Sequence, residues 1–301
     1  MNPRRSLRQI EGLASRGEKM GLSSLPLQHD DRLRPCLFFA PRGGAGADRL
    51  PLLLALHGGA GNPLAMARKT RFHEIAARES FIVAYPGGAG PSLRHSTWNA
   101  GGAHVDGWAE ENRIDDVGYI RKLIDAVAGK LPVDRERIYA AGISKGAMMA
   151  YRLALEASDA IAAIAAVAGP MCGEPAARPR PVSVFHIHGG RDERVPFRGG
   201  RGRFTRKDAV WPSSEEGLDY WRRVNDAADK DAEKVFAPEV TRQRSAGTGG
   251  KDVEVVLLEK RGHEWPKPKP AFLQRILGAA PGDGLDASEE IWRFLRDKKL
   301  G

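Results

Sequence analysis

The sequence is poor in cysteine and has no long apolar run. Its two cysteines, Cys36 and Cys172, are too few for a disulfide framework, so we expect two buried thiols, with a single bridge left open. No run of about 18 apolar residues is present, which predicts the absence of a membrane-spanning helix. The basic N-terminus is followed by no apolar segment, so the sequence predicts no secretory signal and, on this ground alone, a cytoplasmic protein, with the true compartment left open. A start upstream of Met1 and a start at Met20 are both left open.

Acidic residues are also in deficit. The 301 residues include 38 acidic and 47 basic side chains, and the net charge is +9. Most of the basic excess falls in two short segments. Residues 191–207 hold seven basic and two acidic side chains, and residues 260–269 hold four basic and one acidic. The positive charge of the chain is therefore concentrated in these two segments.

Apolar strands alternate with helices along most of the chain, which is typical of an α/β fold. Such an alternation predicts a doubly wound, mostly parallel sheet with helices on both faces. Residues 1–28 are weakly patterned and predict a loose or partly helical extension. Residues 29–301 show no break in composition and predict a single domain. The expected strands are 33–39, 51–56, 81–85, 137–141, 161–167, 182–188 and 253–258. The expected helices are 62–78, 115–131, 147–154, 213–225 and 288–298.

A Gly-Ile-Ser-Lys-Gly motif at residues 142–146 joins an expected strand to an expected helix. The glycines allow a tight turn in which the strand and the helix approach closely. Such a turn holds the hydroxyl of Ser144 at its tip, as in the nucleophile elbow of α/β-hydrolases. The alternative is a glycine-rich turn with an incidental serine.

A serine nucleophile needs a general base, and the base needs a carboxylate that orients it. In α/β-hydrolases the acid and then the histidine follow the serine along the chain. Asp192 follows the strand 182–188, with Glu193 as the alternative acid. His263 follows the strand 253–258. The chain order predicts a triad of Ser144, Asp192 and His263.

An acyl-transfer site also needs hydrogen-bond donors for the oxyanion. The backbone N–H of Lys145 follows the nucleophile directly, and Gly59 or Ala60 would supply the second donor from the loop after the strand 51–56. The sequence His57-Gly58-Gly59 in this loop is similar to the HGGG-type oxyanion loop. A phosphate-binding loop is disfavoured because the spacing of neither dinucleotide-binding nor P-loop motifs is present.

The motifs together resemble the esterase family that includes feruloyl esterases and polyhydroxybutyrate depolymerases. This resemblance covers roughly residues 33–297, and it implies the α/β-hydrolase fold, the triad named above and a cleft lined by Trp98 and Trp265. Lys145 departs from the family, where this position is often Asn, and the missing signal peptide departs from relatives that are often extracellular. The matching segments are residues 56–59, 98–101, 115–118, 142–149, 186–189 with 192 and 195–196, and 262–266.

Two further features have competing interpretations. His186 and His188 share one face of a strand at a spacing seen in metal sites, but no other ligand cluster supports them, so we expect no metal. The basic segments follow the candidate acid and flank the candidate base. Arg198 and Arg201 would then favour anionic esters, against the alternative of an ordinary solvated surface. An RNA-binding role for the arginine- and glycine-rich stretch is disfavoured, so no nucleic-acid partner is expected.

The interpretation that combines these features is a serine esterase that needs no cofactor. Feruloyl, acetyl and hydroxyalkanoate esters are all compatible with the sequence. A serine peptidase or acyltransferase with the same triad, and a non-catalytic binding protein on a hydrolase fold, remain as alternatives. The acyl and alcohol groups and the oligomeric state stay open.

Overall fold

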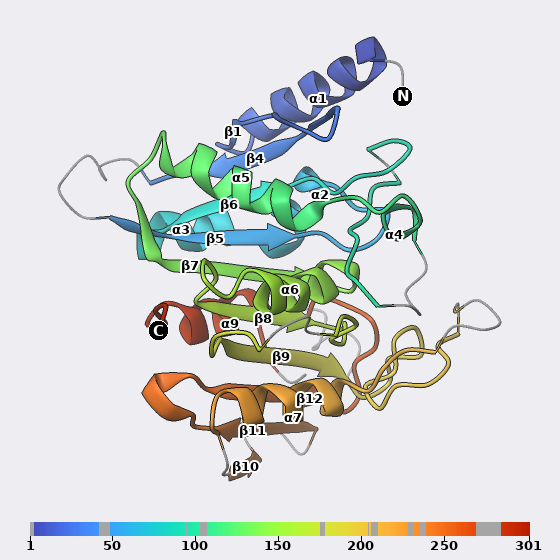
Figure 1. Ribbon diagram of the computed structural model, residues 1–301, viewed down its shortest axis with the longest axis vertical. Coiled ribbons are helices and arrows are strands. Elements are labelled where there is room, and N and C mark those ends of the chain that lie inside the picture. Colours follow the sequence, from blue (N-terminus) through green and yellow to red (C-terminus); the bar gives the residue numbers. More distant parts are fainter. Residues whose placement is uncertain are drawn as a thin grey trace, which may run out of the picture.

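The computed structural model describes residues 3–41, 49–93, 95–102, 107–174, 178–203, 205, 210–227, 231–234, 239–268 and 284–301. Figure 1 shows the arrangement of its strands and helices. The strands are β1 (Ser23–Ser24), β2 (Leu27–His29), β3 (Arg32–Arg34), β4 (Cys36–Phe39), β5 (Leu50–Leu56), β6 (Ile82–Pro86), β7 (Val133–Ile143), β8 (Ala163–Val167), β9 (Ser183–Gly189), β10 (Asp231–Lys234), β11 (Val240–Ser245) and β12 (Val253–Leu258). The helices are α1 (Pro3–Glu18), α2 (Pro63–Thr70), α3 (Phe72–Glu79), α4 (Trp108–Glu111), α5 (Asp116–Ala128), α6 (Lys145–Glu156), α7 (Ser214–Val224) and α9 (Ala287–Leu295), with a short 3-10 turn at Thr248–Gly250.

Ten of the described strands form one sheet in the order β1-β4-β6-β5-β7-β8-β9-β12-β11-β10. The six central strands, from β6 to β12, pair in parallel, and the pairs toward both edges are antiparallel. The expected mostly parallel sheet is therefore present. Because parallel strands end at the same edge of a sheet, the segments that follow β5, β7, β9 and β12 lie along one edge.

Strand β5 shows how the sheet separates two apolar cores. Leu52, Leu54 and Leu56 belong to one cluster of buried side chains, and Leu53 and Ala55 belong to the other. This alternation follows from the two-residue period of a strand that is covered on both faces. Buried residues of α5, α6 and α7 pack in the first cluster, and those of α2, α3 and α9 pack in the second (Figure 1). The helices thus cover both faces, as the sequence predicted.

Of the two alternatives expected for residues 1–28, a loose or a partly helical extension, the structure contains the helical one. Residues 3–18 form α1, and Ile10 and Leu13 are buried. The expected helix 62–78 is two helices, because Arg71 between them has φ 53° and ends α2. Strands β10 and β11 are additional to the expected ones and lie at one edge of the sheet.

Two expectations about the whole chain concern thiols and membranes. Cys36 is buried, Cys172 is half-buried, and both are free thiols. Burial raises the pKa of both thiols, that of Cys172 to about 12. No helix in the described part of the chain is both long enough and apolar enough to cross a membrane. The predicted division into residues 1–28 and a single domain at 29–301 stays a prediction.

Candidate active site

Ser144 occupies a strained turn between β7 and α6. Its φ of 54° and ψ of −122° are rarely adopted by residues other than glycine. The turn needs glycine on both sides. A methyl group on Gly146 would lie 2.2 Å from the carbonyl oxygen of Leu56, and one on Gly142 would lie 2.3 Å from the carbonyl carbon of Gly146. The turn is held in place by a 2.8 Å hydrogen bond from the Ser144 N–H to the Val167 carbonyl.

His57 organises the expected oxyanion loop, although the sequence did not indicate this role. The N–H of Gly88 donates to Nε2 of His57 at 2.9 Å, so this nitrogen carries no proton. Nδ1 then donates to the carbonyl of Gly58 at 2.7 Å. Burial lowers the pKa of His57 to about 4, which keeps the imidazole neutral. The same Gly58 carbonyl accepts from the Gly61 N–H at 3.0 Å, which closes a tight turn around Gly59 and Ala60.

This loop lies against the nucleophile and the first residue of α6. A methyl group on Gly58 would lie 3.5 Å from Cβ of Ser144, and one on Gly59 would lie 3.7 Å from Cγ of Lys145. Ala60 follows in the same turn with φ 57°. The structure therefore brings the expected oxyanion loop and the start of α6 together beside Ser144.

Asp192 and His263 are in direct contact. Nδ1 of His263 lies 2.8 Å from Oδ2 of Asp192. The backbone N–H groups of Arg194 and Val195 both donate to Oδ1 of Asp192 at 2.9 Å. Burial alone would raise the pKa of Asp192, but hydrogen bonds from His188, His263 and Val195 hold it well below its usual range. The carboxylate is therefore ionised at neutral pH, as a partner for an imidazolium must be.

The alternative acid, Glu193, has a different environment. Its side chain is exposed and forms a 3.3 Å ion pair with Arg203, which is also exposed. A carboxylate so solvated and paired with an arginine is poorly placed to orient a histidine.

Ser144, Asp192 and His263 follow β7, β9 and β12 at the same edge of the sheet (Figure 1). Among the described residues no hydrogen bond within 3.5 Å joins the Ser144 hydroxyl to His263. Catalytic hydrogen bonds are often long in the absence of substrate and shorten in the reacting complex. The structure thus contains the contact between the candidate acid and base, and it places the candidate nucleophile along the same edge.

Trp98 and Trp265 do not line an open cleft, contrary to the expectation. Trp98 has no exposed surface, and its indole N–H donates to the His57 carbonyl at 2.8 Å. Trp265 is 5 % exposed and donates to the Ser288 hydroxyl at 3.0 Å. Both rings satisfy their N–H groups inside the core, as buried indoles usually do. They support the oxyanion loop and the loop that bears His263.

The two arginines that were expected to favour anionic esters are both exposed. Arg198 and Arg201 lie in the loop that follows Asp192. Some neighbouring charges are already paired, since Arg261 binds Glu264 at 2.9 Å and Lys260 binds Glu239. The basic residues Arg206, Lys207 and Lys269 of the two segments lie outside the described residues.

Glu110 is a site residue that the sequence did not reveal. Its Oε1 lies 2.5 Å from Nζ of Lys145, and both side chains are largely buried. The same oxygen accepts from the N–H of Ala100 at 3.2 Å. The ion pair therefore ties α4 to the first residue of α6, directly after Ser144. No local pattern in the sequence could have indicated it, because the partners are 35 positions apart.

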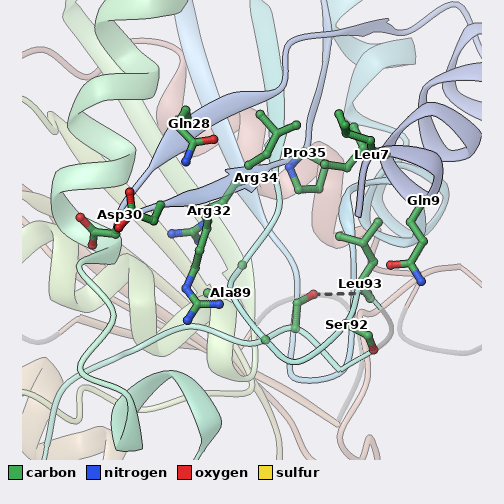
Figure 2. Close-up of a pocket in the computed structure, with 16 residues that line it drawn as sticks. Leu7, Gln9, Gln28, Asp30, Arg32, Arg34, Pro35, Ala89, Ser92 and Leu93 are labelled. Atoms are coloured by element: carbon green, nitrogen blue, oxygen red, sulfur yellow. Dashed lines mark hydrogen bonds between the residues drawn. The ribbon is translucent and has the colours of Figure 1, made fainter. Parts of the chain in front are cut away.

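Two cavities lie near these elements. One of about 400 Å³ is enclosed by α1, the β2–β3 hairpin and the loop after β6 (Figure 2). Its wall includes Ser96, which donates to the Gly61 carbonyl at the back of the oxyanion loop, but none of the three triad candidates. A second cavity, of about 440 Å³, is lined by Met171, Cys172 and Trp211. Cys172 and Trp211 also pack against the small buried cluster formed by Ala100, Met148 and Val195.

Comparisons with known proteins identify the family and the fold. Residues 34–196, more than half of the chain, match the family model described as Esterase PHB depolymerase. The bifunctional acetylxylan esterase/xylanase XynS20E of Neocallimastix patriciarum is 32% identical over 49% of this chain and 20% of its own length. Feruloyl esterase B of Piromyces equi is 28% identical over 62% of this chain and 34% of its own length. The chain thus spans about a fifth and about a third of the length of these two relatives.

The structure is also similar to solved structures. The acetyl xylan esterase from Aspergillus awamori superposes with a TM-score of 0.60 at 14% identity, over 86% of this chain and 99% of that one. Identity this low bears on the fold alone. The fold is the α/β-hydrolase fold that the sequence predicted.

Proposed function

The chain belongs to the Esterase PHB depolymerase family, and we propose on this basis that it is a serine esterase that cleaves carboxylic esters through an acyl-enzyme. The observation that carries the proposal is the 2.8 Å contact between Asp192 and His263 at the same sheet edge as the strained Ser144. We further propose that residues 29–301 form one catalytic domain, since one ten-stranded sheet includes every described strand from β4 to β12.

In the proposed reaction His263 removes the proton from the Ser144 hydroxyl as the oxygen attacks the ester carbonyl. Asp192 accepts the Nδ1–H of His263, fixes its tautomer and stabilises the imidazolium. His263 then protonates the leaving alcohol. A water molecule, deprotonated by the same histidine, attacks the acyl-enzyme and releases the acid. The mechanism uses no metal or organic cofactor.

The negative charge of the tetrahedral intermediate would be stabilised by backbone donors. Lys145 supplies one N–H, and Gly59 or Ala60 supplies the other from the facing turn. Support comes from the close approach of this turn to Ser144 and from the neutral His57, which donates to the Gly58 carbonyl and accepts from the Gly88 N–H. Donors fixed in advance need no reorganisation during the reaction.

We place part of the substrate in the cavity lined by Met171, Cys172 and Trp211. The cluster that borders it includes Met148, whose N–H donates to the Ser144 carbonyl at 3.0 Å, and Val195, whose N–H donates to Asp192. The cavity therefore adjoins residues in contact with both the nucleophile and the acid. Met171, Val210 and Trp211 make part of its wall apolar, beside Glu174 and Glu216, and its volume of about 440 Å³ suits an acyl group larger than acetyl.

The test is hydrolysis of 4-nitrophenyl acetate and butyrate, methyl ferulate and a hydroxybutyrate oligomer by the wild type and by Ser144→Ala. We expect the substitution to lower kcat at least about a thousandfold, since the serine is the proposed nucleophile. Serine-dependent turnover would support the esterase. The relative kcat/KM for methyl ferulate and for the hydroxybutyrate oligomer would then identify the substrate class. Folded protein without serine-dependent turnover would instead favour a binding protein or a peptidase.

We also propose that the exposed Arg198 favours esters that carry a second, anionic group. The probes are 4-nitrophenyl hemisuccinate and the neutral 4-nitrophenyl butyrate. Arg198→Gln should raise the KM for the anionic ester about twofold to fivefold and leave the neutral ester unchanged, because a nearby positive charge raises the local anion concentration. The matched control is Arg68→Gln on α2, another exposed arginine. Equal changes for both esters would refute the selectivity.

A further inference from the structure

Three buried side chains form a hydrogen-bonded series that ends at Asp192. The Tyr151 hydroxyl of α6 lies 3.0 Å from Nδ1 of His186, and Nε2 of His186 lies 2.9 Å from Nδ1 of His188. Nε2 of His188 lies 2.8 Å from the Val195 carbonyl oxygen and 3.4 Å from Oδ2 of Asp192. All three side chains are at most 1 % exposed. This series, Tyr151–His186–His188, has no part in the mechanism described above.

The positions of the protons follow from Tyr151, at the end of the series farthest from Asp192. Burial raises the pKa of Tyr151, so the phenol keeps its proton. In the described part of the chain the acceptor recorded for this proton is Nδ1 of His186, which must then carry a lone pair. Burial holds the pKa of His186 well below its usual range, so the ring is neutral and its proton is on Nε2.

The same logic continues to the acid. Nε2 of His186 donates to Nδ1 of His188, which must therefore accept. The proton of His188 is then on Nε2, where it faces two acceptors, the Val195 carbonyl and the Asp192 carboxylate. Each hydrogen bond in the series points toward Asp192, and each ring has one tautomer only.

His188 consequently acts on Asp192 in two ways. By donating to the Val195 carbonyl it braces the turn whose N–H groups bind the other carboxylate oxygen. Its Nε2 also lies 3.4 Å from Oδ2, the oxygen that accepts from His263, so its proton stabilises the same carboxylate charge. A carboxylate that accepts a second hydrogen bond attracts the proton of His263 less strongly.

We propose that His188, oriented by His186 and Tyr151, is a positioning residue that holds Asp192 and limits the basicity of His263. The proposal rests on the proposed serine-esterase function. Asp192 and, beyond it, His263 are the charged or titratable groups at one end of the series. At the other end, the positive charge of Arg222 on α7 partly offsets the rise that burial causes in the pKa of Tyr151, and Arg222 is itself paired with Asp219.

The test compares His188→Met with His188→Gln in the full-length protein. The two side chains have similar length, but only glutamine keeps an N–H to donate. With 4-nitrophenyl butyrate, His188→Met should lower kcat about tenfold to a hundredfold with little change in KM. The acid limb of its kcat/KM profile should move to higher pH by about half a unit or more, because His263 becomes more basic. His188→Gln should restore most of the rate and the original limb.

A merely structural role for His188 would lower kcat without moving the acid limb, and that result would overturn the proposal. If the His188 variants do not fold, Tyr151→Phe gives the same readout with a smaller change. It should lower kcat about twofold to fivefold and move the limb in the same direction. An unchanged limb would overturn the proposal here as well.

Ser144→Ala separates this inference from the function on which it rests. Activity that survives Ser144→Ala would refute the serine esterase itself. Activity that is lost with Ser144 but is unchanged in rate and pH profile by His188→Met would refute only the role of His188.

Discussion

At the scale of single residues, the candidate site depends on close backbone approaches beside Ser144. The serine has φ 54°, and its neighbours bring β7, α6 and the oxyanion loop within contact distance. Strain of about 1–3 kcal/mol at such a residue persists only where the surroundings enforce it. Substitutions in this turn should therefore affect stability and catalysis together.

Gly146→Ala tests this enforcement. The added methyl group would lie 2.2 Å from the Leu56 carbonyl oxygen, so the start of α6 must move away from β5. We expect a loss of unfolding free energy of about 2–4 kcal/mol and a loss of most esterase activity. Gly12→Ala in α1 is the control, because nothing lies within 4 Å of the added methyl group. Urea unfolding of both variants is the measurement, and a Gly146→Ala protein as stable as Gly12→Ala would contradict the argument.

Lys145 has two separable parts, a backbone N–H and a side chain paired with Glu110. Lys145→Met keeps the N–H but leaves a buried carboxylate without its partner. We expect a loss of about 2–4 kcal/mol in unfolding free energy, as for other broken buried pairs. The fall in kcat should be smaller than that of Ser144→Ala.

The double variant Lys145→Met/Glu110→Gln provides the control for this pair. Removing the carboxylate charge as well should restore at least half of the lost stability. Glu110→Gln alone provides the second single loss. If the loss of unfolding free energy in the double variant equals the sum of the losses in Lys145→Met and Glu110→Gln, the ion pair contributes little.

At the scale of elements, the central strands could be predicted because both of their faces are buried. Residues 51–56 form a continuous apolar run, which only such a strand needs. Strand β11 could not be predicted in this way. Its sequence, Val-Thr-Arg-Gln-Arg-Ser, is polar, and Arg242 within it finds its partners, Glu254 and Glu290, on β12 and α9. A window of sequence cannot show such distant charge pairs.

The residues of the candidate site also fall into those that the sequence could predict and those that it could not. Motif order along the chain was enough to propose Asp192 and His263, which the structure finds in contact. It was not enough for Trp98 and Trp265, whose indole N–H groups bond to a distant carbonyl and a distant hydroxyl. Glu110 and the series behind Asp192 also depend on tertiary contacts.

Arg242 allows a test of how β11 is attached. The side chain is 8 % exposed, lies 2.7 Å from Oε1 of Glu254 and also contacts Glu290. Arg242→Met should lower the unfolding free energy by about 3 kcal/mol, because two carboxylates lose a buried partner. Arg244→Met, on the same strand but with a largely exposed side chain, should cost under about 1 kcal/mol. Chemical denaturation of the two variants is the measurement. Equal losses of unfolding free energy in Arg242→Met and Arg244→Met would contradict the role of the buried Arg242 pairs in attaching β11.

At the scale of the whole molecule, the protein should be sensitive to acid because it buries neutral histidines. Burial lowers the pKa of His57, His73 and His186 below their usual range. The unfolded chain binds protons on these rings near pH 6.5, whereas the folded chain does not. Stability is therefore complete above about pH 6.5 and falls as the pH decreases toward the folded pKa values.

His57 gives this effect a magnitude. With a folded pKa of about 4, it should account for about 2 kcal/mol of lost stability between pH 7.5 and pH 5. Urea unfolding of the wild type should show a decrease in unfolding free energy of at least about 2 kcal/mol from pH 7.5 to pH 5. In His57→Gln this decrease should be smaller by about 2 kcal/mol. His95→Gln, which alters an exposed histidine, should leave the difference unchanged. A wild type equally stable at both pH values would mean that the oxyanion loop accommodates a charged His57. The hydrogen bond from Gly88 to its Nε2 could then not be what holds the loop.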